Sequence, residues 1–193
     1  PIPVLAVTHE NKMLGGAGNV LANIRGLGGQ ADIISLIGDD YEGKQVESSI
    51  EELGVHADGL LNDSARPTTL KTRYLSQNQQ LLRVDHEQVQ PLSPESETLL
   101  FEKADALIAN ADVLILSDYG KGFFSPAIVK RLIKLAAKNK ISVIVDPKSK
   151  DFSIYKGADI ITPNRKELAD ATGGMAVKTD EDIEKAAQYL IKH

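Results

Sequence analysis

The sequence has no cysteine and no tryptophan among its 193 residues, and aromatic residues make up only 5% of it. Without cysteine the chain forms no disulfide, no thiolate nucleophile and no cysteine-ligated metal site, which fits a reducing cytoplasm. No apolar run approaches the length of a membrane span. We therefore expect a cytoplasmic protein without a membrane partner.

Positive charge is also scarce, since 22 Lys and Arg residues stand against 27 Asp and Glu residues and give a formal net charge of -5. A protein that binds mainly to a nucleic-acid backbone needs an excess of basic residues to neutralise phosphates. The composition therefore excludes nucleic acid as the main partner. Small anions can still be bound by a few well-placed lysines.

The glycine-rich stretch at residues 14–29, LGGAGNVLANIRGLGG, is the strongest local signal. Gly15, Gly16 and Gly18 leave the backbone unshielded, and Asn19 follows at the mouth of the turn. Apolar residues at helical spacing predict a helix over 20–27. The free N–H groups at such a helix start suit a phosphate or sugar hydroxyls, but a tight packing turn explains the glycines equally well.

Two nucleotide-binding motifs fit the sequence poorly. The dinucleotide fingerprint is matched at Gly16 and Gly18, but Leu21 occupies its third glycine position. The stretch 38–45, GDDYEGKQ, has P-loop spacing, but Gln45 replaces the Mg²⁺-binding hydroxyl and three carboxylates stand where phosphates need donors. We predict a polar turn there, between a strand at 33–37 and a helix at 45–53.

The remaining pattern predicts an α/β fold with an open, mostly parallel sheet flanked by helices and a small antiparallel β-lid. Alternation at 66–84 around the turn at residues 77–79 predicts the hairpin of this lid. The other predicted strands are 3–8, 113–116, 143–145 and 160–161. The other predicted helices are 97–109, 126–138, 165–172 and one from 181 capped by Thr179 or Asp180.

Polar clusters follow three of the predicted strands, at 117–122, 146–148 and 162–167. The carboxyl ends of parallel strands lie on one edge of a sheet, where ligands bind, so these clusters should meet. Lys121 and Lys148 sit at glycine- or proline-defined junctions of that edge, although solvated surface lysines are the commoner case. Asn164 and Glu167 have the spacing of a capping box, a role that does not exclude one in catalysis.

With these residues assembled, the chain resembles the ribokinase-type (PfkB) sugar kinases, and within them the heptose 7-phosphate kinases. The general resemblance rests on GGAGN at 15–19 with Leu27-Gly28, IGDD at 37–40 with Gly43, DPK at 146–148, and TPN at 162–164 with Glu167. The narrower one rests on SQNQQL at 76–81 with Arg83 and Asp85, and on LSDYGKG at 116–122.

The resemblance implies roles for the matching residues, with ATP and Mg²⁺ as cofactors. Gly15, Gly16 and Asn19 would hold sugar hydroxyls, and Lys121 and Lys148 would grip the phosphate already on the substrate. The lid turn at Gln77, Asn78 and Gln79 would close over the sugar and form a homodimer contact, and Asp118 joins the substrate-binding set. Asn164 and Glu167 would lie near the ATP phosphates, Glu167 acting through the Mg²⁺ hydration shell.

On this resemblance, residues 1–12 and 63–88 form the β-lid, and 13–62 with 89–193 form part of an α/β sugar-kinase domain. The implied reaction is ATP-dependent phosphorylation of heptose 7-phosphate to heptose 1,7-bisphosphate, in ADP-heptose synthesis for the lipopolysaccharide core.

The catalytic G-A-G-D motif of such kinases has no match, because Gly173-Gly174 is followed by Met175-Ala176. We therefore expect a chain truncated at both ends, with its general base beyond His193 and no activity of its own. The alternatives are a non-catalytic sugar-phosphate-binding module, a ribokinase-type kinase for another sugar and, third, a nicotinamide oxidoreductase.

Overall fold

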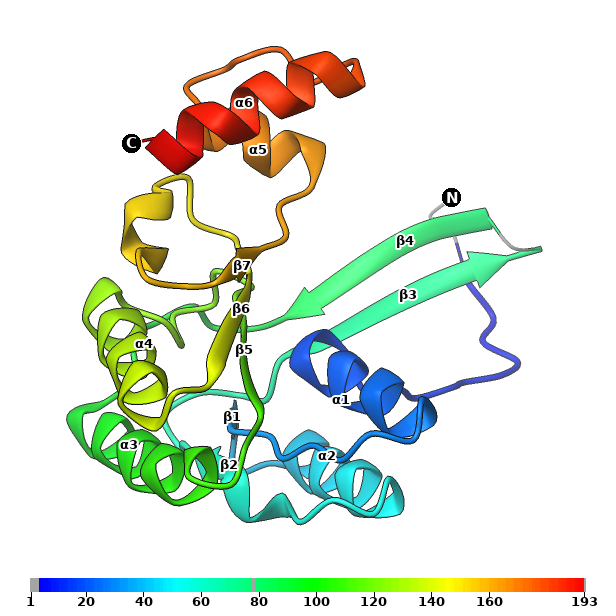
Figure 1. Ribbon diagram of the computed structural model, residues 1–193. Helices are drawn as coiled ribbons and strands as arrows, with labels where there is room; N and C mark the ends of the chain where they lie inside the picture. The colour runs from blue at the N-terminus through cyan, green and yellow to red at the C-terminus, as the bar shows by residue number, and fades with distance from the viewer. Residues whose placement is uncertain (1–3, 78, 193) are drawn as a thin grey trace.

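The structure, a computed structural model, describes residues 4–77 and 79–192 and shows an α/β body from which a long hairpin projects (Figure 1). Strand β1 (Ser35–Ile37) pairs in parallel with β2 (Leu60–Asn62). Strands β5 (Val113–Ser117), β6 (Ser142–Asp146) and β7 (Ile160–Ile161) form a second parallel sheet in that order. The hairpin consists of β3 (Leu70–Ser76) and β4 (Gln79–His86). The predicted parallel strands and antiparallel lid are thus confirmed.

The helices lie around these sheets and begin where the sequence supplies a cap. They are α1 (Gly16–Gly26), α2 (Tyr41–Glu52), α3 (Pro94–Ile108), α4 (Pro126–Asn139), α5 (Arg165–Ala171) and α6 (Asp180–Lys192), with 3-10 turns at Ala57–Gly59 and Phe152–Tyr155. The hydroxyls of Ser93 and Ser125 accept N–H bonds at the starts of α3 and α4, where a proline occupies the first turn. No helix in the described part of the chain is both long enough and apolar enough to cross a bilayer.

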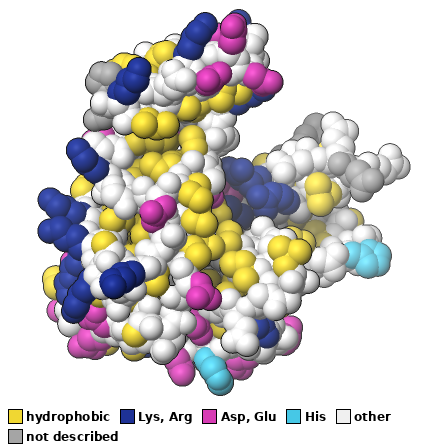
Figure 2. Space-filling view, viewed as in Figure 1, with side chains coloured by type: hydrophobic (Ala, Val, Ile, Leu, Met, Phe, Trp, Pro, Cys, Tyr) yellow, Lys and Arg dark blue, Asp and Glu magenta, His cyan; other side chains and the backbone are white. Residues whose placement is uncertain are grey.

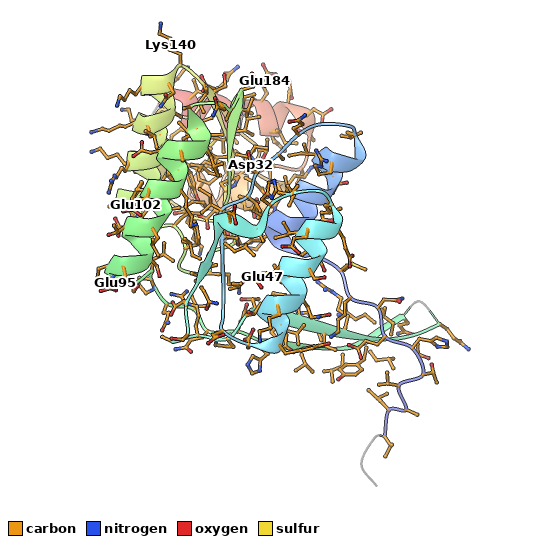
Figure 3. All side chains as sticks on the ribbon, turned by 90° about the horizontal axis from the view of Figure 1, so that it is seen from below. Asp32, Glu47, Glu95, Glu102, Lys140 and Glu184 are labelled. Atoms are coloured by element: carbon orange, nitrogen blue, oxygen red, sulfur yellow. The ribbon has the colours of Figure 1, made fainter. Side chains whose placement is uncertain are left out.

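The main core lies between the strands and the helix pair α3 and α4, which pack side by side (Figures 1 and 3). Leu100 of α3, Val129 of α4, and Leu116 and Val145 of the strands are each no more than 2% exposed. Leu61 of β2 belongs to the same cluster, so the two-stranded sheet shares its core with the three-stranded one. In Figure 3 the charged Glu95 and Glu102 lie on the outer side of this helix pair, and Lys140 lies at the end of α4.

Two predictions about the first forty residues are wrong. Residues 4–15 form no strand, because no described strand pairs with them, and Val4 and Val7 remain 83% and 64% exposed. Helix α1 begins at Gly16 rather than residue 20, since Gly15 caps it with an extended backbone. The short strand β2 was not predicted at all. The other helices and strands differ from prediction mainly by a few residues at their ends.

The end of β1 is joined to the entry of the hairpin by Asp40 and Thr68. The Asp40 carboxylate caps α2 by accepting from the Gly43 N–H at 2.8 Å, and it also accepts from the Thr68 N–H and hydroxyl, both at 2.7 Å. The Thr68 hydroxyl in turn accepts from the buried Gly38 N–H at 2.8 Å. Burial alone would raise the pKa of Asp40, but these hydrogen bonds hold it below its usual value. The predicted polar turn at 38–45 is therefore confirmed only for residues 38–40, which form a packed junction, because residues 41–45 already belong to α2.

Replacing Thr68→Val should cost about 1–3 kcal/mol in the free energy of unfolding near neutral pH, because the buried Gly38 N–H loses its acceptor. Since the pKa of Asp40 is lowered in the folded state, the stabilisation it provides is present above its unfolded pKa. This stabilisation is lost as the pH falls through the folded-state pKa of Asp40. The difference in unfolding free energy between the variant and the wild type should therefore be smaller at acidic pH. Urea denaturation of the full-length protein at neutral and acidic pH measures both effects.

The control is Thr69→Val, because the neighbouring Thr69 is exposed. It should change the unfolding free energy by less than about 0.5 kcal/mol. Equal denaturation midpoints for the two variants at neutral pH would show that the junction contributes nothing to stability.

Candidate functional site

The polar loops after β5, β6 and β7 meet at one edge of the sheet, as the sequence predicts. The Asp118 N–H donates to the Asp146 carbonyl at 2.9 Å, which joins the first loop to the second. Gly120 lies so near the second loop that a β-carbon on it would come within 3.2 Å of the Lys148 side chain. Lys148 Nζ lies 3.3 Å from Glu167 Oε1 at the start of α5, beyond the third strand. Three segments distant in sequence therefore build one site.

A hydroxyl that the sequence analysis did not single out fixes the first two loops. Tyr155 is 1% exposed, and its hydroxyl donates to Asp118 Oδ2 at 2.6 Å. The same oxygen accepts from the N–H groups of Lys148 and Ser149, both at 3.3 Å. Burial and the bond to Asp118 raise the pKa of Tyr155 to about 12, so the phenol stays neutral and can donate. Asp118 also accepts from the Gly120 N–H, and both of its oxygens hold loop structure.

Lys121 lies between the β5 loop and the foot of the hairpin, which is the end where β3 begins and β4 ends. Its Nζ is 2.7 Å from Glu87 Oε1, just beyond the end of β4. The other oxygen of Glu87 lies 3.0 Å from Lys71 Nζ on β3. Two lysines therefore share one carboxylate, and the Lys121 side chain keeps 38% of its surface exposed to a ligand.

Asn164 and Glu167 form the capping box that their spacing predicts. Asn164 Oδ1 accepts from the Glu167 N–H at 2.9 Å, and Glu167 Oε2 accepts from the Asn164 N–H at 3.0 Å. The remaining Glu167 oxygen faces Lys148, whose side chain is 54% exposed. Capping is thus the observed role of both residues, and a role in binding ATP stays a prediction.

Asp146 is a second carboxylate beside Glu167. Its pKa is raised chiefly by burial and further by the negative charge of Glu167, while Lys148 opposes the shift. No group of three or more His, Asp or Glu able to enclose a metal ion occurs among residues 4–77 and 79–192. Mg²⁺ in proteins usually keeps several waters and takes one or two carboxylates with substrate phosphates, so Asp146 and Glu167 have the donor chemistry for a hydrated Mg²⁺.

The glycine turn at the start of α1 reaches the same edge. Gly16 has φ +53°, and a β-carbon there would lie 3.4 Å from the ring of Tyr119 in the β5 loop. Gly18 is buried against Leu14, so packing explains that glycine. Gly15 has open space around it, and Asn19 is exposed in the first turn of the helix. Gly15 and Asn19 are therefore accessible to a ligand.

The lid turn is not brought to this site within the chain. Gln77 and Gln79 are exposed at the tip of a hairpin that extends away from the body (Figure 1), and Asn78 lies outside the described residues. Of the residues that shape the site, sequence reasoning missed Glu87 and Tyr155. Glu87 follows a strand with no motif around it, and Tyr155 lies in an irregular connection, so neither carries a local signal.

Comparison with known proteins finds bacterial relatives of this chain. The chain is 43% identical over 191 residues to the bifunctional protein HldE of Paramagnetospirillum magneticum, covering 99% of this chain and 39% of that protein. It is 48% identical over 174 residues to the bifunctional protein HldE of Caulobacter vibrioides, covering 90% of this chain and 35% of that protein. The chain thus spans about two fifths of the length of these curated relatives.

The fold is also that of solved sugar kinases. The structure of Arabidopsis thaliana ribokinase complexed with ribose and ATP superimposes with a TM-score of 0.68 at 22% identity, covering 92% of this chain and 57% of that one. The fold is therefore ribokinase-like. Residues 2–193 match the model of the pfkB family carbohydrate kinases, and the chain belongs to that family.

Proposed function

We propose that this chain forms the sugar-binding and lid portion of an ATP-dependent kinase that phosphorylates heptose 7-phosphate to heptose 1,7-bisphosphate. The observation that carries the proposal is that the loops bearing Lys121 and Lys148 meet at one sheet edge, where Tyr119 also lies against the glycine-rich start of α1. The HldE relatives support it, as do the resemblances at 76–85 and 116–122. The product would enter ADP-heptose synthesis for the lipopolysaccharide core.

In this proposal the two lysines bind the phosphate that the sugar already carries. A lysine ammonium is a compact point charge that suits a phosphate dianion, and both side chains are at least one-third exposed. Gly15, Gly16 and Asn19 hold the sugar hydroxyls, and Asp118 binds the substrate from the β5 loop. The hairpin extends away from this edge within the chain (Figure 1), so its turn at Gln77, Asn78 and Gln79 would close over the sugar only after the hairpin has moved toward the site.

Asn164 and Glu167 take the ATP side of the site, with Glu167 reaching Mg²⁺ through water. Phosphoryl transfer depends on positioning and on electrostatic stabilisation of the transferring group, and bound Mg²⁺ supplies positive charge for that group. The contribution of this chain is to orient the phosphorylated sugar. It also presents the carboxylates of Glu167 and Asp146 toward the hydrated cation.

We further propose that the hairpin forms a homodimer contact. Its register separates an apolar face, with Thr72, Tyr74, Leu82 and Val84, from a charged face that includes Lys71 and Asp85. Leu82 and Val84 are 48% and 46% exposed, and every residue of β4 is exposed. A hairpin with an uncovered apolar face and free edges is stabilised by pairing with a second copy.

In the full-length protein, Lys121→Ala and Lys148→Ala should each raise the KM for heptose 7-phosphate at least about tenfold, because a charge-assisted bond to the phosphate is lost. The kcat should fall much less, and Lys138→Ala on the exposed side of α4 should leave both constants unchanged. Steady-state kinetics measures the change in KM and the change in kcat separately. An unchanged KM in both variants would refute the phosphate assignment, and tight binding without turnover by the wild type would favour a binding module.

Glu167→Gln separates capping from metal binding, because a glutamine oxygen can still accept from the Asn164 N–H while the charge is removed. We expect the free energy of unfolding to change by less than about 0.5 kcal/mol. The Mg²⁺ concentration needed for half-maximal activity should rise about tenfold, since a charged water-mediated contact is lost. Asn164→Ala, which removes the cap, should instead cost about 1 kcal/mol of stability. An unaltered Mg²⁺ dependence in Glu167→Gln would remove Glu167 from the metal site.

Leu82→Glu should convert a dimer to monomers, because it puts a charge on the apolar face of the hairpin. Arg83→Glu is the matched control, since it introduces the same side chain on the opposite face. Sedimentation velocity of the full-length protein distinguishes the two forms. A dimer that persists in Leu82→Glu would exclude this face as the contact.

A further inference from the structure

A row of ion pairs connects the hairpin to the loop that follows β5. Arg83 Nε lies 2.9 Å from Asp85 Oδ1, and Asp85 Oδ2 lies 3.0 Å from Lys71 Nζ. The same Lys71 ammonium lies 3.0 Å from Glu87 Oε2, and Glu87 Oε1 lies 2.7 Å from Lys121 Nζ. Figure 2 shows Lys and Arg side chains gathered where the hairpin leaves the body. Glu87 is the only member of this row that touches Lys121.

Glu87 is held more firmly than a surface carboxylate. Its side chain is 18% exposed, and each of its oxygens faces an ammonium group. The bonds from Lys121 and then Lys71 lower the pKa of Glu87, so it is ionised at neutral pH. Burial would lower the pKa of Lys71, but the bonds to Asp85 and Glu87 raise it. Every charge in the row has an opposite partner in this state.

A phosphate bound to Lys121 cannot share that lysine with Glu87 without cost. Glu87 Oε1 is already in contact with Lys121 Nζ, so a dianion on the same ammonium group would lie beside a second negative charge. Glu87 can give up Lys121 and still keep Lys71 as a partner. An exchange of partners at Lys121 therefore leaves no buried carboxylate unpaired.

We propose that, without substrate, Glu87 pairs with Lys121 where the substrate phosphate would otherwise bind. When the phosphate binds, the ion pair between Glu87 and Lys121 breaks and Lys121 pairs with the phosphate instead. The inference rests on the proposed function, because it takes Lys121 as a phosphate ligand. The transfer breaks the ion pair between the foot of the hairpin and the β5 loop. A sugar without an anionic group offers Lys121 only neutral hydroxyl acceptors, which are weaker partners than the Glu87 carboxylate, so Glu87 acts as a specificity-determining residue for phosphorylated sugars.

The test is Glu87→Gln in the full-length protein, with binding of heptose 7-phosphate followed by calorimetry. We expect the Kd to fall about threefold to tenfold, because the competing charge is gone, and the gain to shrink as salt is raised. Asp85→Asn is the matched control, since it removes the same charge from Lys71 without touching Lys121. Its Kd should stay within about twofold of the wild type. A Kd that is unchanged or higher in Glu87→Gln overturns the exchange.

Two further variants separate this inference from the proposed function. If Lys121→Ala leaves the Kd unchanged, the phosphate assignment itself fails. If Lys121→Ala weakens binding while Glu87→Gln does not strengthen it, only the exchange fails. In the double variant that combines Lys121→Ala with Glu87→Gln, the Glu87→Gln substitution should no longer change the Kd, because Glu87 acts through Lys121.

Hydrogen exchange on the wild-type protein supplies a test without any substitution. Addition of heptose 7-phosphate should speed exchange of the backbone amides around Glu87, because the contact to the β5 loop is released. Slower or unchanged exchange there, with the ligand shown to bind, would contradict the release.

Discussion

Arg66 buries its guanidinium at the foot of the hairpin, where it is only 8% exposed, and joins the chain entering the hairpin to the chain leaving it. It pairs with Asp63 at 2.9 Å and donates to the carbonyls of Gln90 and Pro91 at 3.0 and 2.8 Å. A buried charge is tolerated only when it is paired and hydrogen-bonded, so these partners are held together. The β5 loop packs on the same point, since a β-carbon on Gly122, with φ +85°, would lie 2.0 Å from the Gln90 carbonyl. The position of Lys121 next to Gly122 thus depends on the Arg66 contacts.

The foot of the hairpin is fixed to the body, whereas the strands beyond it are exposed. The two parts of the hairpin can therefore serve different functions. At the foot, Arg66 and the Asp40–Thr68 junction fix its entry, and Glu87 links its exit to Lys121. Beyond the foot, the strands are bonded mainly to each other, and the whole of β4 is exposed. Because side chains alternate across the strands, one face carries the ion pairs and the other presents apolar residues. In the proposed function the charged face serves the substrate and the apolar face serves a second subunit.

The sequence predicts those features that are decided by neighbouring residues. The Asn164 and Glu167 box and the alternating hairpin both rest on contacts within a few positions. The parallel order of the strands made the meeting of their polar ends predictable as well. Glu87 and Tyr155 were missed because their partners lie 34 and 37 residues away in the chain. A strand was predicted at 3–8 from local apolar content, but residues 4–8 form none, because a strand forms only where another strand pairs with it.

Three charged groups at the sheet edge already have a partner within the chain. Lys121 pairs with Glu87, Lys148 with Glu167, and Asp118 accepts from Tyr155. A ligand that takes either lysine must therefore offer it a better partner than the one it replaces, because a lost ion pair must be compensated. A neutral sugar offers either lysine only hydroxyl acceptors, whereas a phosphate dianion offers a stronger, charged partner. Under the proposed function, the transfer of Lys148 to the sugar phosphate also frees a Glu167 oxygen for the hydration shell of Mg²⁺. The paired ground state thus favours binding of the two anionic substrates together over binding of either alone.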